Sequence, residues 1–417
     1  MTVREAWDRR AGGLPREFWL VLVGSFINRL GTFVQPFLVL YLVRERGVSE
    51  STAGLLLAIN GVAGLSSQIV GGVLADRLGR RETMLLGTIA FAGALGLLAV
   101  AESPAVLVAG VVLTGATADL YRPASSALVA DVVPPRDRVR AFGLHFWVIN
   151  LGFAAATSVA GLLAEHGYGL LFGLDALTTV VFGVVVFAFV GETRPERDDT
   201  TAPGRFTDPF TDRLMLGVIG SWFLYSCVYF QVFISLPLVM TADGLSLTVF
   251  GLVAGLNGLV IVVVQPLVLD RLNRLPRVET GAWSMTVVGL GFGLHGFADT
   301  GWQHAACVVV WTLGEIGATS VGSALVADIS PAHLRGRYSG AFGFTFGAAA
   351  VVAPLVGTVT LEHVGQAALW TGCLVVGLAG AAVQLTLRDG VARRSTLTHE
   401  ALAPPAPTHQ VLPDSTA

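Results

Sequence analysis

The chain has 417 residues, of which 53% are hydrophobic and 13% are charged, and its formal net charge is −3. Soluble proteins carry about twice this share of charged residues, so the composition argues against a soluble enzyme and indicates a membrane protein. The near-neutral charge balance predicts no nucleic-acid partner, and three dispersed cysteines in apolar segments predict neither a disulfide framework nor a metal site.

Twelve apolar segments of roughly 20 residues follow one another along the chain, each long enough to cross a hydrocarbon core of ~30 Å. Their apolar runs are continuous rather than alternating, which favours helices over the strands of a barrel. We therefore predict an all-α membrane protein with twelve transmembrane helices, at residues 18–42, 52–75, 83–101, 105–130, 141–164, 169–191, 213–240, 247–270, 280–298, 303–328, 338–360 and 366–387.

The polar segments around these helices divide the chain. Residues 1–17 are charged and lack the apolar core of a signal peptide, so we expect a cytoplasmic N-terminal tail. Residues 18–191 and 213–387 then form two six-helix bundles, joined by a cytoplasmic linker at 192–212 that is rich in charge, proline and threonine. Composition predicts a disordered cytoplasmic tail at 388–417, and both a solvated end and a binding segment for a partner fit it.

Arginine alone determines the expected orientation, because the chain contains no lysine. Of its 26 basic residues, 22 fall in the tails and in the loops that share the side of the N-terminus. Only Arg44 and Arg46 fall in a loop on the other side. Arginine-rich loops are cytoplasmic, and the lack of lysine suggests a GC-rich bacterial genome. We therefore predict a multi-pass protein of the bacterial inner (plasma) membrane with both termini in the cytoplasm.

One short sequence occurs twice, because Ser126–Asp131 (SALVAD) recurs as Ser323–Asp328, a shift of 197 residues. The same shift relates other pairs without gaps: Gly54 and Gly251, Asn60 and Asn257, Gln68 and Gln265, Arg80 and Arg277, Glu165 and Glu362. Two copies of one unit in parallel order, in a chain this apolar, indicate a transporter with two pseudo-symmetric halves. We expect the repeated asparagines and glutamines to form hydrogen bonds between helices.

Between the second and third spans lies the sequence Gly72–Arg81, GVLADRLGRR. It resembles the signature loop of the major facilitator superfamily, of the form G-x-x-x-D-R-x-G-R-R, and matches it at every defining position. Together with twelve spans and two halves, the resemblance covers the whole chain and implies the major facilitator fold. Physical reasoning agrees, because glycine permits close approach of two helices at Gly72 and a tight turn at Gly79.

The resemblance also implies a cytoplasmic gate. In the family, the loop carboxylate, the arginine four residues later and a carboxylate at the end of span four form a charge cluster that joins the halves in the outward-facing state. Here these residues are Asp76, Arg80 and Asp131. Alternatively, the arginines only set the topology and contact lipid headgroups. The expected gate residues are Gly72, Asp76, Arg77, Gly79, Arg80, Arg81, Asp131, Arg277 and Asp328.

The second copy of the loop differs from the first. Asn273 replaces the carboxylate and Pro276 replaces the glycine, whereas Arg277 and Asp328 are kept. We therefore expect an asymmetric gate that is stronger in the first half.

Four charged residues lie near the centres of predicted spans: Arg29 in the first, Asp119 and Arg122 in the fourth, and Glu315 in the tenth. A charge at mid-bilayer costs at least ~2.5–3.5 kcal/mol, so each is a functional hypothesis. In the superfamily that the chain resembles, spans one, four, seven and ten line the central cavity. The expected substrate and proton-coupling cavity includes Asn28, Arg29, Asp119, Arg122, Tyr225, Tyr229, Gln231 and Glu315.

Each of these residues also permits a structural interpretation. Arg29 either pairs with Asp119 or binds substrate, and Asp119 and Arg122 share a helix face and are able to pair with each other. Glu315 has no basic neighbour in its span, so it is the first candidate for a proton carrier, with Asp119 second. Tyr225 and Tyr229 either stack on a ligand or only pack. Asp175 in span six is expected to cap or pair locally.

The segments 120–128 and 225–237 resemble the drug:proton antiporter branch of the superfamily, in particular its multidrug-resistance H-type members. The span-five signature of that branch departs here, because Ala156 and Thr157 stand where it has glycine and proline. No phosphate-binding loop is present, so an ion gradient is the expected energy source.

We predict a secondary active transporter that exports small amphipathic compounds in exchange for protons by alternating access. The alternative is a proton symporter or facilitator for a specific metabolite. An enzyme is not expected, because the buried acids have no accompanying nucleophile or metal cluster. The expected partners are a small-molecule substrate, protons and the lipid bilayer, with a monomeric protein and no cofactor.

Overall fold

The computed structural model describes residues 13–134, 137–192, 207–272, 274–331 and 334–394. Every regular element in these residues is a helix. The first half contains α2 (Arg16–Leu30), α3 (Val34–Leu40), η1 (Tyr41–Glu45), α4 (Glu50–Arg77), α5 (Arg80–Ala99), α6 (Pro104–Ala118), α7 (Tyr121–Val132), α8 (Arg138–Ala164) and α9 (Tyr168–Phe189). The second half contains α10 (Asp208–Thr211), α11 (Arg213–Tyr229), η3 (Phe230–Val232), α12 (Ser235–Ala242), α13 (Leu247–Leu272), α14 (Arg277–Leu294), η4 (His295–Phe297), α15 (Gly301–Ile329), α16 (Arg335–His363) and α17 (Gln366–Thr386).

Within the part of the chain that the structure describes, eleven helical segments are long and apolar enough to cross a membrane. They match all the predicted spans except the ninth, which corresponds to α14 and η4. α14 has 18 residues and begins with Arg277 and Glu279, whose charges lower its mean hydropathy. It packs against α15 and α17 like its neighbours. The predicted all-α membrane fold of about twelve transmembrane helices is thus confirmed.

The first, fourth and seventh spans are broken, which corrects the prediction that they are continuous helices. The breaks fall at residues 31–33, 119–120 and 230–234. At the first break, Gly31 lies so close to α9 that a Cβ there would be 1.7 Å from Oγ1 of Thr178. The N–H of Val34, at the start of α3, donates to the Asp175 carboxylate of α9 at 3.3 Å. A side chain from another helix therefore satisfies a backbone donor that the break leaves without an intrahelical partner.

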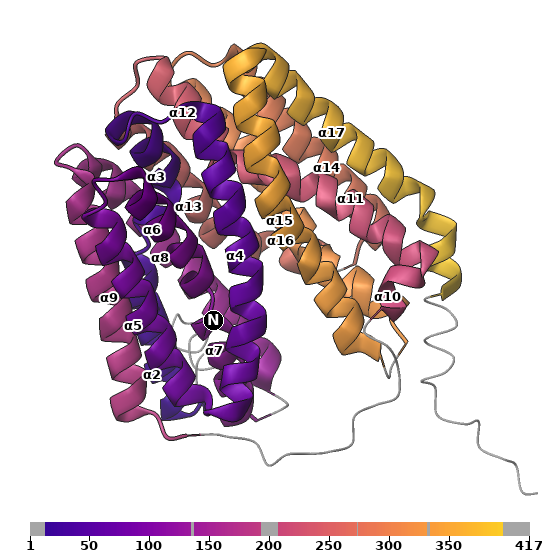
Figure 1. The fold of residues 1–417 in the computed structure, drawn as a ribbon. Helices are drawn as coiled ribbons and strands as arrows, with labels where there is room; N and C mark the ends of the chain where they lie inside the picture. The colour runs from indigo at the N-terminus through magenta and orange to yellow at the C-terminus, as the bar shows by residue number, and fades with distance from the viewer. Residues whose placement is uncertain (1–12, 135–136, 193–206, 273, 332–333, 395–417) are drawn as a thin grey trace, which may run out of the picture.

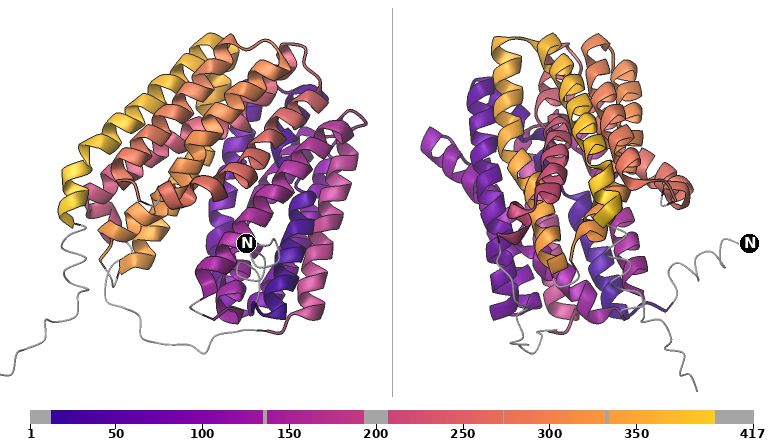
Figure 2. Two further views of the ribbon diagram at one scale, coloured as in Figure 1. Left: turned by 180° about the vertical axis from the view of Figure 1, so that it is seen from behind. Right: turned by 90° about the vertical axis from the view of Figure 1, so that its right-hand side faces the viewer.

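The two halves of the chain form two groups of helices that lie side by side (Figure 1). α4 packs against α16 and α8 against α13, and these two contacts are equivalent under the shift of 197 residues. α3 and α12 also meet. We call the end of the molecule that carries the loops at residues 46–49 and 243–246 the distal end, and the opposite end, where α2 begins, the tail end. The halves meet at the distal end and diverge toward the tail end (Figure 2).

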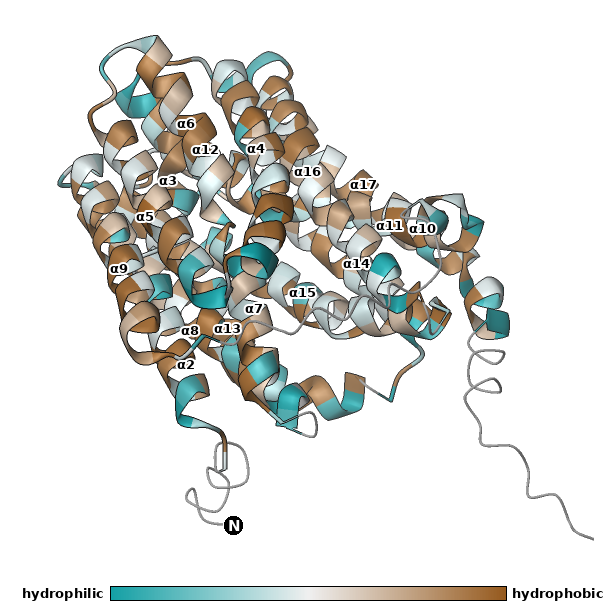
Figure 3. Cartoon of the chain, turned by 60° about the horizontal axis from the view of Figure 1, so that its bottom comes forward, coloured by the Kyte–Doolittle hydropathy of each residue, from teal (hydrophilic) through white to brown (hydrophobic). Residues whose placement is uncertain are grey.

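The outer surface of the bundle is apolar. Many large hydrophobic side chains are exposed on the outside of the helices, among them Ile69, Leu177 and Leu267. Hydrophobic colour runs along the outer helices, and hydrophilic colour gathers at the helix ends of the tail-end face (Figure 3). An apolar belt with polar ends is what a lipid bilayer requires of a multi-pass protein.

Candidate functional site

A cavity of about 540 Å³ lies between the two halves. This volume falls within the usual range of roughly 300–1,000 Å³ for small-molecule sites. Both halves supply its lining, and the helices broken at residues 31–33, 119–120 and 230–234 all contribute to it. Of the eight predicted cavity residues, four line the cavity from the first half: Asn28, Arg29, Asp119 and Arg122. All four are polar or charged. Tyr229 lines it from the second half.

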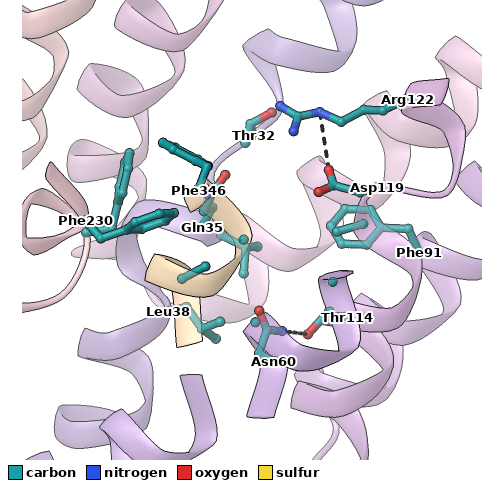
Figure 4. Close-up of a pocket in the computed structure, with 18 of the residues that line it drawn as sticks. Thr32, Gln35, Leu38, Asn60, Phe91, Thr114, Asp119, Arg122, Phe230 and Phe346 are labelled. Carbon is teal, nitrogen blue, oxygen red and sulfur yellow. Dashed lines mark hydrogen bonds and ion pairs between the residues drawn. The ribbon is translucent and has the colours of Figure 1, made fainter. Parts of the chain in front are cut away.

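Asp119 and Arg122 form an ion pair in the cavity wall. Nε of Arg122 lies 3.3 Å from Oδ1 of Asp119 (Figure 4). Nε2 of Gln68 donates to Oδ2 of Asp119 at 3.1 Å. Both oxygens of the Asp119 carboxylate are therefore engaged within the first half. The side chain of Arg122 is 50% exposed, against 26% for Asp119. The cavity thus meets the arginine more than the carboxylate.

Asn28 and Arg29 lie in the last turn of α2, next to the break. Tyr121 donates to Oδ1 of Asn28 at 3.2 Å, and Nδ2 of Asn28 donates to Thr179 at 3.0 Å, so α7 and α9 fix the amide. Arg29 is brought close to α8 by Gly152, where a Cβ would lie 2.7 Å from Cβ of Arg29. Asn28 therefore acts mainly as a bridge between helices, while the Arg29 side chain borders the cavity.

Asp175 lies at the cavity wall and is 2% exposed. It accepts a local hydrogen bond of 3.5 Å from Thr179, four residues further along α9, as the sequence predicts. It also accepts from the N–H of Val34, so the element that it caps is α3, 141 residues away in sequence. No local signal at Asp175 could have indicated this contact.

Aromatic rings form the wall on the other side of the cavity. Tyr229, Phe230, Phe233 and Phe346 of the second half line it. The ring centroids of Phe230 and Phe346 lie 4.6 Å apart. These two side chains lie across the cavity from Asp119 and Arg122 (Figure 4). The charged groups of the lining therefore come from the first half, whereas aromatic rings line the cavity from both halves, with Phe91 and Phe153 supplied by the first.

Glu315 of α15 lies one layer behind this aromatic wall. It is 6% exposed and does not border the cavity itself. Nδ2 of Asn257 donates to its Oε2 at 2.6 Å, and the carboxylate also interacts with Tyr229. Asn257 and Tyr229 both line the cavity, so they connect the buried carboxylate to the space where a substrate would sit.

Tyr225 and Gln231 are structural in this arrangement. Tyr225 is buried and stacks on Tyr229 with ring centroids 6.3 Å apart. Nε2 of Gln231 donates to the carbonyl oxygen of Ala353 at 3.2 Å, and its Oε1 accepts from Ser235 at 2.6 Å. Neither side chain lines the cavity.

The signature loop lies at the tail end and gathers its charges within the first half. Arg80 contacts Asp76 at 3.0 Å and Asp131 at 3.4 Å, and it also donates to the carbonyl oxygen of Ala75. Arg81 lies over the ring of Phe187 at 4.0 Å. Gly79 has a φ of 112°, a conformation that favours glycine at the turn between α4 and α5.

The remaining gate residues are less engaged. A Cβ at Gly72 would have no neighbour within 4 Å, so the predicted close approach of a second helix at this glycine is wrong. The side chain of Arg77 is exposed. In the second half, Arg277 pairs with Asp328 and donates to the carbonyl oxygen of Ala324. Asn273, which the sequence comparison of the two loops singled out, lies outside the described residues.

The family of the chain follows from a match to most of its length. A family model of the Major Facilitator Superfamily matches residues 21–319 and 244–413. The chain belongs to the Major Facilitator Superfamily. It is a multi-pass membrane transporter rather than an enzyme, because the family and the matched relatives are transporters.

Curated relatives within the superfamily are distant. The chain is 26% identical over 386 residues to an uncharacterized MFS-type transporter, YttB, of Bacillus subtilis, covering 89% of this chain and 95% of the relative. It is 23% identical over 371 residues to a Na(+), Li(+), K(+)/H(+) antiporter of Planococcus maritimus, covering 80% and 87%. A shorter match, 30% identical over 160 residues, joins 38% of this chain to 41% of the quinolone resistance protein NorA of Staphylococcus aureus.

Solved structures share the fold at still lower identity. A peptide transporter of the POT family, in complex with sulfate, matches with a TM-score of 0.76 and 18% identity. The match covers 92% of this chain and 96% of that one. At this identity the likeness extends to the fold alone.

Sequence reasoning did not find two sets of contacts in this superfamily member. At the tail end, Glu192 accepts the N–H groups of Arg80 and Arg81 at 2.7 and 3.1 Å and so caps α5. A carboxylate directly after the sixth span was the available signal. At the distal end, Glu165 accepts from the N–H and the hydroxyl of Thr248 at 3.2 and 2.6 Å.

The same distal contact occurs a second time. Glu362 accepts the N–H of Ser51 at 2.6 Å. Glu165 and Glu362, and likewise Ser51 and Thr248, are related by the shift of 197 residues. Each half thus places one carboxylate at the start of the other half's second transmembrane helix, which is α4 in the first half and α13 in the second. We call these two contacts the distal glutamate pair.

Proposed function

We propose that the protein is a proton-coupled exporter of small amphipathic compounds that works by alternating access. The observation that carries the proposal is Glu315, a buried carboxylate that contacts two cavity-lining side chains, Asn257 and Tyr229. A buried carboxylate without a cationic partner changes its protonation with its surroundings, which is what a coupling site needs. In the part of the chain that the structure describes, Glu315 forms no ion pair with an arginine.

The proposed coupling step follows from the same contacts. An ionised Glu315 accepts the hydrogen bond from Asn257 and holds it and Tyr229 toward α15. When a proton binds, the carboxylate loses its charge and one acceptor site, so both side chains are released toward the cavity. The released side chains would occupy the space in which a substrate sits, so proton binding and substrate binding oppose each other, which gives exchange rather than joint transport.

The orientation is part of the proposal. The arginine distribution supports a cytoplasmic tail end, and the structure would then represent an inward-facing state whose distal, outer end is closed. Asp76, Arg80 and Asp131 then lie at the cytoplasmic mouth and would meet the second half when that mouth closes. The names of two relatives, a cation/proton antiporter and a quinolone resistance protein, support antiport and efflux.

The proposal is tested in everted membrane vesicles energised by respiration. Addition of a transported compound should dissipate part of the proton gradient, because each export cycle carries protons down the gradient. Glu315→Gln should abolish this response, since an amide cannot carry the proton, while counterflow exchange of labelled compound persists. Glu45→Gln, an exposed carboxylate at the distal end, is the matched control and should behave as wild type.

Three results would overturn the proposal. A Glu315→Gln protein that still concentrates substrate would remove this carboxylate from coupling. Proton entry on addition of a metabolite to right-side-out cells, with no response to any compound in everted vesicles, would favour a proton symporter. Concentration-driven flux without any proton movement would indicate a facilitator.

A further inference from the structure

The charged side chains that line the cavity differ in the number of partners that they contact. Asp119 is held through both oxygens by Arg122 and Gln68. Asp175 is buried, and its oxygens accept from Val34 and Thr179. The two carboxylates of the lining therefore present little unengaged acceptor capacity to a ligand.

The two arginines of the lining differ from these carboxylates. Among the described residues, the side chain of Arg29 forms no ion pair or hydrogen bond. It lies close enough to Asp175 and His145 for its charge to act on both groups. Arg122 contacts Asp119 through Nε, and half of its side chain is exposed. Nε2 of His145 is taken by a hydrogen bond with Ser25 at 3.1 Å. The polar wall thus offers guanidinium donors rather than carboxylate acceptors.

We propose that the transported compounds carry an anionic group, such as a carboxylate, that binds Arg29, together with a flat apolar body that packs on Phe230 and Phe346. The proposal rests on the exporter function proposed above and specifies its substrate class. A guanidinium presents a fork of N–H donors that matches a carboxylate in geometry and charge. The aromatic pair, with centroids 4.6 Å apart, offers a stacking surface on the facing wall.

The energetics favour an anion over a cation. Arg29 lies near the centre of a membrane-spanning segment, where an uncompensated charge is costly, so an anion that neutralises it is favoured. A cationic ligand would have to displace Arg122 or Gln68 from Asp119, and it would be repelled by Arg29. A cavity of about 540 Å³ holds one fused ring system with a single acidic substituent.

The experiment uses three probes of one shape and different charge: naphthoate, naphthamide and naphthylmethylammonium. Binding of each to the purified full-length protein is measured calorimetrically in lipid nanodiscs without a proton gradient. Wild type should bind naphthoate at least about tenfold more tightly than naphthamide, as expected for hydrogen bonds to a charged group. The ammonium probe should bind more weakly than both.

The variants separate charge from structure. Arg29→Gln should remove the preference for the acid over the amide, because it weakens acid binding far more than amide binding, whereas Arg29→Lys should keep part of the preference. Arg271→Gln, an exposed arginine at the end of α13, is the matched control and should keep the whole preference. Thermal unfolding of each variant confirms that it is folded.

Three results would overturn the inference: equal binding of acid and amide by wild type, tighter binding of the ammonium probe, or an undiminished preference in Arg29→Gln. Absence of naphthoate binding at millimolar concentration would overturn it as well. A failure of the exporter function would be distinguishable from a failure of this inference. If the acid binds through Arg29 but no proton gradient drives its transport in proteoliposomes, the substrate class stands and proton-coupled export falls.

Discussion

Asn257 and Asn60 occupy equivalent positions under the shift of 197 residues, yet their amides have different partners. Asn60 donates to the carbonyl oxygen of Val111 at 2.7 Å and to Thr114 at 3.2 Å. Asn257 donates to the carboxylate of Glu315 at 2.6 Å and to Thr312 at 3.1 Å. The same residue type thus bridges two helices in one half and contacts the proposed proton carrier in the other.

Single-residue reasoning from the sequence reached part of this arrangement. A charge in an apolar segment is conspicuous, so Arg29, Asp119, Arg122 and Glu315 were found without a structure. The spacing of Asp119 and Arg122 placed them on one helix face, and they pair. The partners from other helices, Gln68 and Asn257, could not be assigned, because sequence spacing says nothing of the rotation of one helix against another.

The contrast between the asparagines gives a paired prediction. Asn257→Ala removes a donor from a buried carboxylate, a change of ~1.5–3 kcal/mol for a hydrogen bond to a charged group. Substrate-driven proton flux in proteoliposomes should therefore fall by about tenfold or more, while counterflow exchange continues. Asn60 also lines the cavity but contacts no carboxylate, so Asn60→Ala should lower the free energy of unfolding by about 0.5–1.5 kcal/mol and leave the proton flux per transported substrate unchanged. Equal loss of proton flux in both variants would separate Asn257 from coupling.

At the scale of elements, apolar length predicted where helices occur but not where they break. Each break at residues 31–33, 119–120 and 230–234 is followed within three residues by a proline, namely Pro36, Pro123 and Pro237. A proline has no N–H to donate and its ring clashes with the carbonyl four residues earlier, which lies within the break in each case, so these prolines were an available local signal. The first break is also held by tertiary contacts, namely the close approach of Gly31 to Thr178 and the acceptance of the Val34 N–H by Asp175. Such contacts join residues over 140 positions apart and leave no local pattern.

The first break should depend on Asp175 as its acceptor. Asp175→Ala leaves a buried N–H at the start of α3 without a partner, which typically costs about 1–3 kcal/mol. Asp175→Asn keeps an acceptor oxygen at the same position and should cost clearly less. Denaturant or thermal unfolding of the purified protein measures both. Asn and Ala variants of equal stability would show that the carboxylate does not hold the break.

At the scale of the whole molecule, the internal repeat indicates two similar halves, and it also relates two contacts between those halves. Glu165 and Glu362 recur at the same position in each copy, immediately after or near the end of a span. Their partners, Thr248 and Ser51, lie in the opposite half. The sequence shows that the pairs are equivalent, but only the relative placement of the halves shows that each carboxylate reaches across to the other half.

The distal glutamate pair should help to hold the outer end closed. Glu165→Gln and Glu362→Gln each replace a charged acceptor by a neutral one, so each should shift the population modestly toward states with a separated distal end. Because the two contacts are independent and equivalent, the double variant should show the larger shift. Spin labels on cysteines introduced at Glu102 and Gln366, one in each half, report the separation by double electron–electron resonance. Glu45→Gln is the exposed control at the same end.

The contact also predicts a direction for the effect of pH. Hydrogen bonds from the hydroxyl and the N–H of Thr248 hold the pKa of Glu165 below its ordinary value of 4.5. A lowered pKa means that the ionised carboxylate is favoured by the closed contact, so the contact is fully stabilising above 4.5 and weakens as the pH falls through the lowered value. Acidification on the distal side should therefore lengthen the label distance in wild type. Glu165→Gln, which cannot ionise, should lose its share of this response, and an unchanged pH response in the double variant would show that other groups govern opening.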